Sequence, residues 1–312
     1  MMYDSYQAMA DLGDSVRLLA SNAERILKTW GTGPFASPLQ RMAAYYEAVA
    51  LAGFTHERPG FDLPFVEARG EATPVEEEVV LSTAFCDLRR FRKASGADEP
   101  KVLLVAPMSG HFATLLRGTL KTMLRDHEVY VTDWINPRII PLQAGPFTLD
   151  DYTQHLIDFV RHIGPDSHIV AVCQPAVSAL AATAVLAKEG ANHQPASLTL
   201  MAGPIDTRIA PTKVNDLANE KPIEWFRDKM IGIVPARLAG AGRRVYPGFL
   251  QLSAFMSMNA ERHAKSFVDM FQHRVAGDFE KADAIHEFYK EYFTIMDLCA
   301  EFYLETVEQV FQ

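Results

Sequence analysis

The sequence predicts an α/β fold in which a mostly parallel sheet carries helices on both faces. Between about residues 102 and 203, apolar strand-like runs alternate with helix-like segments, the pattern of parallel strands joined by crossover helices. The first run, VLLVAP at 102–107, is apolar throughout, as expected of a strand buried on both faces. A later run meets a cysteine, Cys173, where a strand gives way to a helix. These observations together indicate the fold class.

The segment before this core is predicted to be mostly helical. Apolar residues recur at helical spacing over 3–30 and over about 38–52, with a Gly/Pro-rich stretch between the two helices. Residues 53–75 are rich in Gly and Pro and are expected to form a connector. Strands are expected near 78–81 and 85–92, and alternation along the second indicates that one of its faces is well buried.

The core is predicted to hold four apolar strands, at 102–107, 128–134, 168–172 and 197–201. Helices are expected between them, at 113–125, 150–163 and 177–188. The middle helix is expected to begin at an Asp cap. From residue 211 onward we expect helices and loops without an apolar strand, ending in a long aromatic-rich helix over 284–312.

Three parts are therefore predicted along the chain. They are an N-terminal helical extension with its connector at 1–76, an α/β core at 77–210 and a helical cap or lid at 211–312.

Composition narrows the classes of partner and cofactor. The chain has 30 Lys and Arg against 39 Asp and Glu, a formal net charge of −9, and no basic block, so neither nucleic acid nor a membrane is an expected partner. The three cysteines are widely spaced, without a CxxC pair or clustered histidines, so no metal site or cofactor is expected. No secretory signal and no apolar run near the roughly 18 residues of a membrane span is found, which predicts a cytoplasmic location.

The segment from His168 to Lys188 has the layout of a nucleophile elbow. A β-branched strand ends at Cys173, and a helix begins after Gln174 and Pro175. A thiol at a helix N-terminus faces unpaired N–H groups and the positive end of the helix dipole, and both favour the thiolate that attacks carbon. The alternative is that Cys173 is a buried structural cysteine, since free cysteine is among the most buried residue types.

An oxyanion hole is expected from backbone N–H groups beside this cysteine. One is that of Gln174, and the others are those of Met108 and Ser109, in the loop after the first core strand. The alternative for that loop is an ordinary strand-to-helix connection with a flexible glycine, Gly110.

Other titratable residues are weaker candidates. His111 lies in the oxyanion loop, where a histidine is more often a surface or hydrogen-bonding residue than a general base. Asp133 and Asp206 both end strands, and Asp206 stands where an acid could orient a histidine, although an Asp in such a turn usually caps a helix. The pair Arg243-Arg244 is expected to be solvated and has no assigned role.

Six blocks of sequence, in this order, resemble one enzyme family along essentially the whole chain. They are VLLVAPMSGHFATLLRGTL, EVYVTDWINPRIIPL, VCQPAVSALAA, MAGPIDTRIAPTKVN, GRRVYPGFLQ and MNAERH. They are similar to the intracellular polyhydroxyalkanoate (polyhydroxybutyrate) depolymerases. The resemblance implies a cytoplasmic, granule-associated α/β-hydrolase that cleaves the ester bonds of stored polymer with a Cys-Asp-His triad, and it places the nucleophile at Cys173.

The sequence departs from the family pattern in one respect. The motifs that carry the triad acid and histidine in the family do not occur here, so neither is expected in this chain, and the last core strands are expected to be absent. We therefore expect impaired hydrolysis and self-association through an unpaired edge at 197–201. The alternatives are a non-catalytic remnant that binds granules or a partner, and an acyl transferase resembling the polymer synthases. Ala171 and Pro175 speak against the synthase, because glycines are expected around its cysteine.

Overall fold

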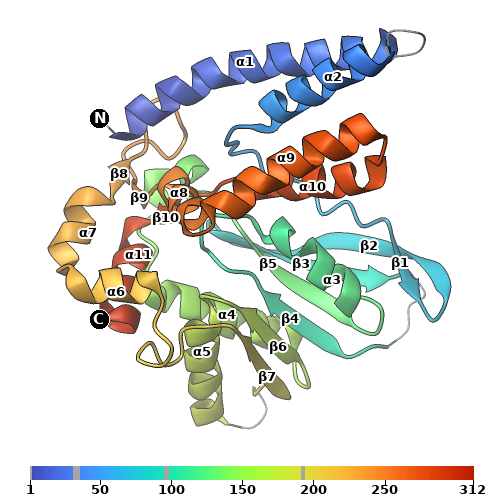
Figure 1. The fold of residues 1–312 in the computed structure, drawn as a ribbon. Helices are drawn as coiled ribbons and strands as arrows, with labels where there is room; N and C mark the ends of the chain where they lie inside the picture. The colour runs from blue at the N-terminus through green and yellow to red at the C-terminus, as the bar shows by residue number, and fades with distance from the viewer. Residues whose placement is uncertain (1, 31–35, 95–97, 191–193) are drawn as a thin grey trace. The chain divides into compact units, whose positions relative to one another are not determined.

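The computed structural model describes residues 2–30, 36–94, 98–190 and 194–312 (Figure 1). The Gly/Pro-rich stretch between the first two helices falls largely at 31–35, outside the described residues. The chain forms two compact units, each with its own core. Unit 1 comprises residues 1–59 and 249–295, and unit 2 comprises residues 60–248 and 296–312. The three-part division at residues 76 and 210 stays a prediction.

Unit 2 is built on a sheet whose seven described strands follow the order β1-β2-β3-β5-β4-β6-β7 (Figure 1). The strands are β1 (Phe65–Ala68), β2 (Glu71–Ser82), β3 (Cys86–Lys93), β4 (Lys101–Val105), β5 (Glu128–Trp134), β6 (His168–Val172) and β7 (Ser197–Met201). Strands β1 to β3 are antiparallel, and β3 pairs antiparallel with β5. Strands β5, β4, β6 and β7 are parallel neighbours, so the four predicted core strands are confirmed.

Helices cover both faces of this sheet, which confirms the predicted fold class. They include the 3-10 turn η1 (Ala113–Leu116) with α3 (Arg117–Met123), α4 (Leu149–Ile163) and α5 (Ala176–Glu189). Because crossovers between parallel strands are right-handed, the connection from β4 to β5 places α3 on one face. The connections from β5 to β6 and from β6 to β7 run in the opposite direction, so α4 and α5 lie on the other face and pack together.

The start of α4 differs from the prediction. The cap is Thr148 and not an aspartate: its side chain accepts a hydrogen bond from the Asp151 N–H at 3.1 Å, and the Asp151 carboxylate accepts one from the Thr148 N–H at 2.8 Å. This reciprocal pair satisfies two N–H groups that the first turn of a helix leaves without partners. Helix α4 then buries an apolar stripe that includes Tyr152, Leu156 and Phe159 against the sheet.

Two other expectations from the sequence were wrong. The region 53–75 is not only a connector, because it contains β1 and the beginning of β2. The region after residue 211 holds a small antiparallel sheet in the order β10-β9-β8, formed by β8 (Gly232–Ile233), β9 (Arg244–Tyr246) and β10 (Leu298–Cys299). Strands of two or three residues are too short to show the alternation that reveals a strand in sequence.

The last helix is also shorter than predicted. The expected run over 284–312 is divided into the end of α10 at Tyr292, the strand β10, the helix α11 (Ala300–Thr306) and a final turn, η5 (Val307–Phe311). Two further helices of unit 2, α6 (Lys213–Glu220) and α7 (Ile223–Lys229), precede β8, and short turns η2 (Pro137–Ile139) and η3 (Leu142–Ala144) follow β5. Helix α11 packs on α4 and α7.

The chain leaves unit 2 and returns to it at adjacent points. Strand β9 precedes the departure and β10 follows the return, and the two strands pair directly, Tyr246 with Leu298. The N–H of Gly248 donates to the Asp297 carboxylate at 2.8 Å. A Cβ at Gly248 would lie 2.6 Å from the Met296 carbonyl oxygen, so this close approach requires glycine. Residues 249–295 are therefore an insertion whose two ends meet.

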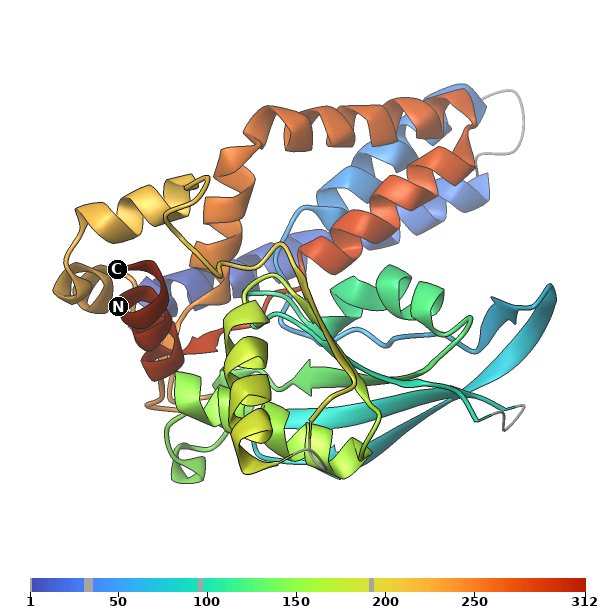
Figure 2. The same ribbon diagram turned by 90° about the horizontal axis from the view of Figure 1, so that it is seen from below.

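Unit 1 is helical. Its helices are α1 (Met2–Trp30), α2 (Ala36–Leu51), α8 (Gly248–Met258), α9 (Ala260–Ala276) and α10 (Phe279–Tyr292). The predicted N-terminal helices are thus observed, and they pack side by side, with α2 also against α9 (Figures 1 and 2). The core includes Leu252, Tyr289 and Phe293. A buried ion pair crosses from α2 to α9, where Arg274 donates to both carboxylate oxygens of Glu47 at 2.8 and 2.6 Å.

Candidate active site

Cys173 stands directly after β6 in a backbone conformation that is rare for a residue with a side chain. Its φ is 67°, in the left-handed region. Its N–H donates to the Met201 carbonyl of the neighbouring strand at 2.7 Å, and its carbonyl accepts from the Ala176 N–H at 3.1 Å. A non-glycine residue held there costs about 1–3 kcal/mol, and such strain is concentrated at functional sites. The strand, the sharp turn and helix α5 follow in the order predicted from the sequence.

A close backbone approach accompanies this turn. A Cβ at Gly203, two residues beyond β7, would lie 2.1 Å from the Ala176 Cβ and 2.8 Å from the Cys173 carbonyl oxygen. Only glycine at 203 and a small residue at 176 allow the two segments to pass this closely. The local pattern around Cys173 does not reveal this pair, because Gly203 lies 30 residues further along the chain.

The three cysteines differ in exposure. Cys173 is exposed, whereas Cys86 and Cys299 are buried, so the alternative of a buried structural cysteine applies to the other two. Burial raises the pKa of the Cys86 thiol well above its ordinary value, and the nearby carboxylates of Asp133 and Asp87 raise it further. Burial also raises the pKa of Cys299 to about 12. The thiolate is the form that attacks a substrate, and the raised pKa values disfavour it at Cys86 and Cys299. Of the three cysteines, Cys173 is therefore the one that a substrate can reach.

The loop after β4 lies at the same edge of the sheet as Cys173. Strands β4 and β6 are parallel neighbours, with Val105 opposite Ala171, so the segments that follow the two strands leave the sheet side by side. The Ala106 carbonyl accepts hydrogen bonds from the Trp134 indole and the Tyr152 hydroxyl, each at 3.0 Å. These two buried side chains fix the start of the loop.

The far end of the loop is fixed as well. Gly110 has a φ of 90°, and its carbonyl accepts from the Met296 N–H at 2.9 Å. Between the fixed ends, the backbone N–H groups of Met108 and Ser109 donate to no described residue, and the same holds for the N–H of Gln174. These three N–H groups are the ones expected to form the oxyanion hole, and the local backbone leaves them available to a substrate.

The hydrogen-bond partners of Cys173 and of the other titratable candidates bear on a catalytic triad. No described histidine or carboxylate is hydrogen-bonded to the Cys173 thiol. His111 is buried and has a partner of its own. Asp133 is buried and accepts from Arg89 at 2.5 Å, so it is one half of an ion pair within the sheet.

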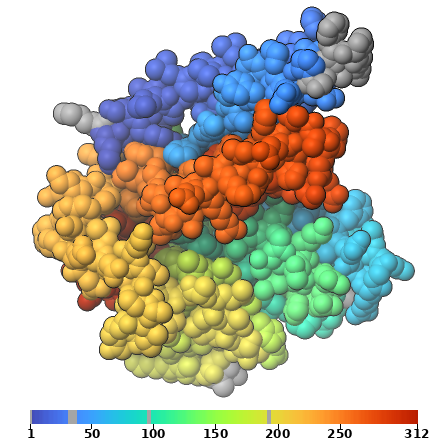
Figure 3. All heavy atoms as spheres, in the orientation of Figure 1, coloured from blue at the N-terminus to red at the C-terminus, as the bar shows by residue number. Residues whose placement is uncertain are grey.

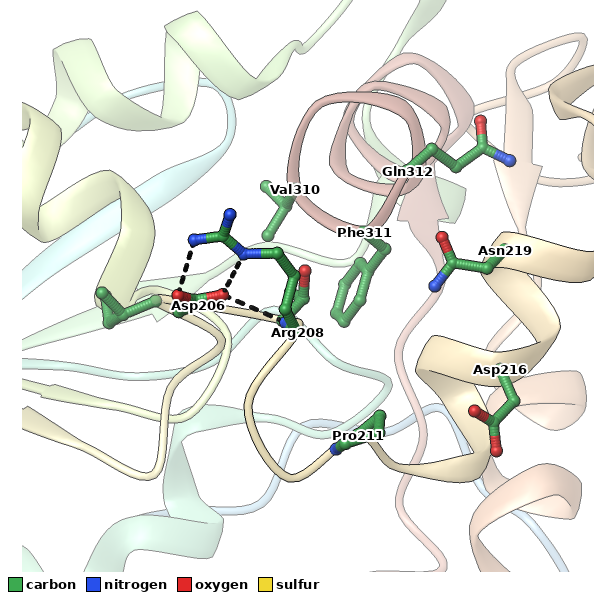
Figure 4. Close-up of a pocket in the computed structure, with 10 residues that line it drawn as sticks. Asp206, Arg208, Pro211, Asp216, Asn219, Val310, Phe311 and Gln312 are labelled. Atoms are coloured by element: carbon green, nitrogen blue, oxygen red, sulfur yellow. Dashed lines mark hydrogen bonds and ion pairs between the residues drawn. The ribbon is translucent and has the colours of Figure 1, made fainter.

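Asp206 is held by Arg208. The guanidinium donates to both carboxylate oxygens at 2.8 Å, and the Arg208 N–H adds a third bond at 3.1 Å (Figure 4). These hydrogen bonds lower the pKa of Asp206 to about 2. To orient a histidine, the Asp206 carboxylate would have to leave Arg208.

The same ion pair borders a pocket of about 560 Å³ (Figure 4). The loop after β7, helix α6 and the turn η5 contribute its walls, and Arg208, Asn219 and Phe311 are among its lining residues. Cys173 is not among them, so this pocket is separate from the elbow.

The prediction that Arg243 and Arg244 are both solvated is wrong for Arg243 and correct for Arg244, which is exposed. Arg243 is buried, and its guanidinium donates to the carbonyls of Ile140, Pro141 and Gly145 at 3.2, 2.7 and 2.7 Å. It secures the loop after β5 and so serves the fold. Nothing in a local dipeptide distinguishes this role from a solvated one.

Two further properties concern metals and membranes. In the described part of the chain, no three His, Cys, Asp or Glu side chains come close enough together to hold a metal ion. The described helices include none with both the length and the apolar character needed to cross a bilayer.

The fold and this turn define a class of protein. A mostly parallel sheet, with a strained nucleophile candidate between an inner strand and a helix and a loop with available N–H groups after the neighbouring strand, is the arrangement of the α/β hydrolases. Residues 202–312 match the family described as PHB de-polymerase C-terminus. Over these 111 residues the chain is similar to the PHB depolymerases, in agreement with the resemblance of its sequence.

Solved structures with a similar arrangement are distant in sequence. A proposed lipase from Acinetobacter baumannii is 13% identical, with 70% of this chain and 65% of that chain covered and a TM-score of 0.35. An alpha/beta hydrolase from a Penicillium species is 16% identical (61% and 67% covered, TM-score 0.36), and a carboxylesterase from Bacillus subtilis is 15% identical (62% and 60%, TM-score 0.33). The matched regions thus span about two thirds or less of those proteins. Comparison with curated proteins gives no match.

Proposed function

We propose that this protein hydrolyses the ester bonds of poly(3-hydroxyalkanoate) storage polymer, polyhydroxybutyrate above all, with Cys173 as the nucleophile. The observation that carries the proposal is the left-handed, exposed Cys173 between β6 and α5. The PHB depolymerase match at residues 202–312 supports the class of substrate. A cytoplasmic location at the granule surface belongs to the same proposal, and no metal or cofactor enters it.

The chemistry starts with attack of the Cys173 thiolate on the ester carbonyl carbon. The carbonyl π electrons move to oxygen, and we expect the N–H groups of Gln174, Met108 and Ser109 to stabilise the oxyanion that forms. Collapse of this intermediate breaks the ester C–O bond and releases the alcohol end of the polymer, which takes up a proton. A thioester remains on Cys173, and water then hydrolyses it to the free acid and regenerates the thiol.

A second candidate function follows from one observation. No described histidine is hydrogen-bonded to the Cys173 thiol, and a thiol without a base depends on its own acidity and on the N-terminus of α5. A chain with little turnover that binds granules or a partner would fit this observation. The two candidates differ in whether an acyl group is transferred to Cys173.

The test therefore measures both turnover and acylation. The full chain is incubated with amorphous polyhydroxybutyrate granules and with a 4-nitrophenyl 3-hydroxybutyrate ester, and an acyl adduct is mapped by mass spectrometry. We expect the adduct on the peptide that contains Cys173, and we expect Cys173→Ala to abolish both the adduct and whatever turnover the wild-type chain shows.

The matched controls are Cys86→Ala and Cys299→Ala, which remove buried thiols and should keep most of the activity once folding is verified by circular dichroism. Retained turnover in the Cys173→Ala variant would refute the nucleophile. Granule binding without any adduct on the wild-type chain would favour the second candidate.

A further inference from the structure

Helix α1 carries a row of large apolar side chains that project into solvent. The row consists of Met9, Leu12, Val16, Leu19, Ile26 and Trp30, with exposed fractions between 50% and 74%. They belong to one side of a 29-residue helix in unit 1, which lies along the surface of that unit (Figure 3). Scattered exposed apolar residues need no explanation, but a continuous row on one helix does.

The spacing of the row is regular. With Ala23 between Leu19 and Ile26, the positions advance by 3, 4, 3, 4, 3 and 4 residues from 9 to 30. This is a heptad pattern with a mean period of 3.5, maintained for three heptads. Such a pattern is the seam of a coiled coil, whereas a helix that lies on a surface follows the 3.6 period with a broader apolar face. The pattern therefore indicates a partner helix.

The opposite side of α1 already has its contacts. Tyr3 and Ala20 are buried, and the ring of Tyr6 stacks on Phe249 with 3.9 Å between centroids. Helix α1 also packs along α2. The seam is thus a second apolar side that the core of unit 1 does not use.

We propose that two copies of this chain associate through α1 as an antiparallel two-helix coiled coil. The charges on α1 support a second copy in this orientation. Its first half, residues 2–15, carries Asp4, Asp11 and Asp14, and its second half, residues 16–30, carries three Arg or Lys and one Glu. An antiparallel pair places the acidic half of each helix beside the basic half of the other, and a parallel pair places like charges together.

The area is sufficient for a specific dimer. Side chains of this size present roughly 150–250 Å² in full, so the observed exposures leave about 100 Å² on each. Six such residues offer about 600 Å² per helix and about 1,200 Å² for a pair, within the range of specific interfaces. Positions beside the seam are small, with Ala8, Ser15 and Thr29, and allow close approach of the helices.

The first experiment measures mass. Analytical ultracentrifugation of the full chain over a range of micromolar concentrations should give twice the monomer mass of 34.8 kDa. Leu19→Glu, which places two charges in a symmetric seam, should raise the dissociation constant of the dimer at least tenfold. Its matched control is Leu18→Glu, because Leu18 is 64% exposed but lies off the seam, and that variant should remain dimeric. Circular dichroism verifies that both variants keep their helices.

The second experiment fixes the orientation. In a Cys173→Ala background, which removes the exposed thiol, Ser5→Cys is oxidised in the dimer. Two copies of residue 5 lie near opposite ends of an antiparallel pair, so no cross-linked dimer should form. A disulfide at this position would overturn the antiparallel arrangement.

Other outcomes refute the association itself. A wild-type monomer at all concentrations, or a dimer that Leu19→Glu does not weaken, would show that the seam has no second copy. A monomer that loses binding to polymer granules on Leu19→Glu would assign the seam to the polymer surface. Dimers that dissociate only when Thr199→Pro disrupts the β7 edge would assign self-association to the sheet.

Discussion

Replacing Gly203, in the loop after the neighbouring strand β7, with alanine should disturb the turn at Cys173. The new Cβ would lie 2.1 Å from the Ala176 Cβ and 2.8 Å from the Cys173 carbonyl oxygen, and neither neighbour is the end of a flexible side chain. Something in the backbone must therefore move. Overpacking of this kind typically costs about 1–3 kcal/mol, so we expect Gly203→Ala to lower the free energy of unfolding by that amount.

The assay combines denaturant unfolding with the rate of alkylation of the exposed Cys173 thiol by iodoacetamide. Gly118→Ala is the matched control, because nothing lies within 4 Å of a Cβ at Gly118 in helix α3. Alanine there should be neutral or add up to about 1 kcal/mol. Ala176→Gly, combined with Gly203→Ala, removes the shorter contact and should recover part of the loss. If Gly203→Ala matches the Gly118→Ala control in stability and in thiol reactivity, the close approach does not constrain the turn.

Two further predictions concern the buried charges and thiols. Arg274→Met leaves the Glu47 carboxylate, which is 3% exposed, without its bidentate partner, and it should lower the free energy of unfolding by about 3–5 kcal/mol. The control Lys281→Met, on the surface of the same unit, should lower it by less than about 1 kcal/mol. Equal losses in the two variants would show that the Arg274–Glu47 pair does not stabilise the unit. Because burial raises the pKa of Cys299 to about 12, its contribution to stability is full below about pH 9 and is lost as the pH rises towards 12, by up to roughly 4 kcal/mol. The wild type should therefore lose more stability than Cys299→Ala over that range, and parallel pH profiles would contradict the shift.

The parts of the fold that sequence predicts well are those with a strong periodic signal. The run VLLVAP is buried on both faces, and a continuous apolar strand has few alternative structures. The strand that ends before Cys173 buries one face completely, with Ile169 and Ala171. Strands β8 to β10 were missed, because two or three residues carry no period. The end of the chain was predicted as one helix, since its aromatic residues suit either a helix or the packed turns that α11 and η5 form.

In the candidate site, too, the features with a local sequence signal were predicted and those that depend on distant contacts were not. Cys173 and Gln174 lie at one strand-to-helix junction, and Met108 lies at another. In each case the sequence of the junction itself contains the signal. Gly203 acts at a distance of about 30 residues through one close contact, and no local pattern marks it. Arg243 was expected to be solvated, because its three carbonyl partners lie about a hundred residues earlier in the chain.

Unit 1 is assembled from two segments that lie far apart in the sequence, residues 1–59 and 249–295, and this has a consequence for the order of events during synthesis. Arg274 follows its partner Glu47 by 227 positions. A ribosome that adds about 5–20 residues per second needs roughly 10–45 s between the two. In that interval the nascent hairpin of α1 and α2 lacks α9 and the bidentate partner of Glu47, although Lys28 of α1 lies 3.9 Å from that carboxylate in the folded unit. The N-terminal hairpin is therefore the part of the chain that chaperones at the ribosome encounter longest in an unfinished state.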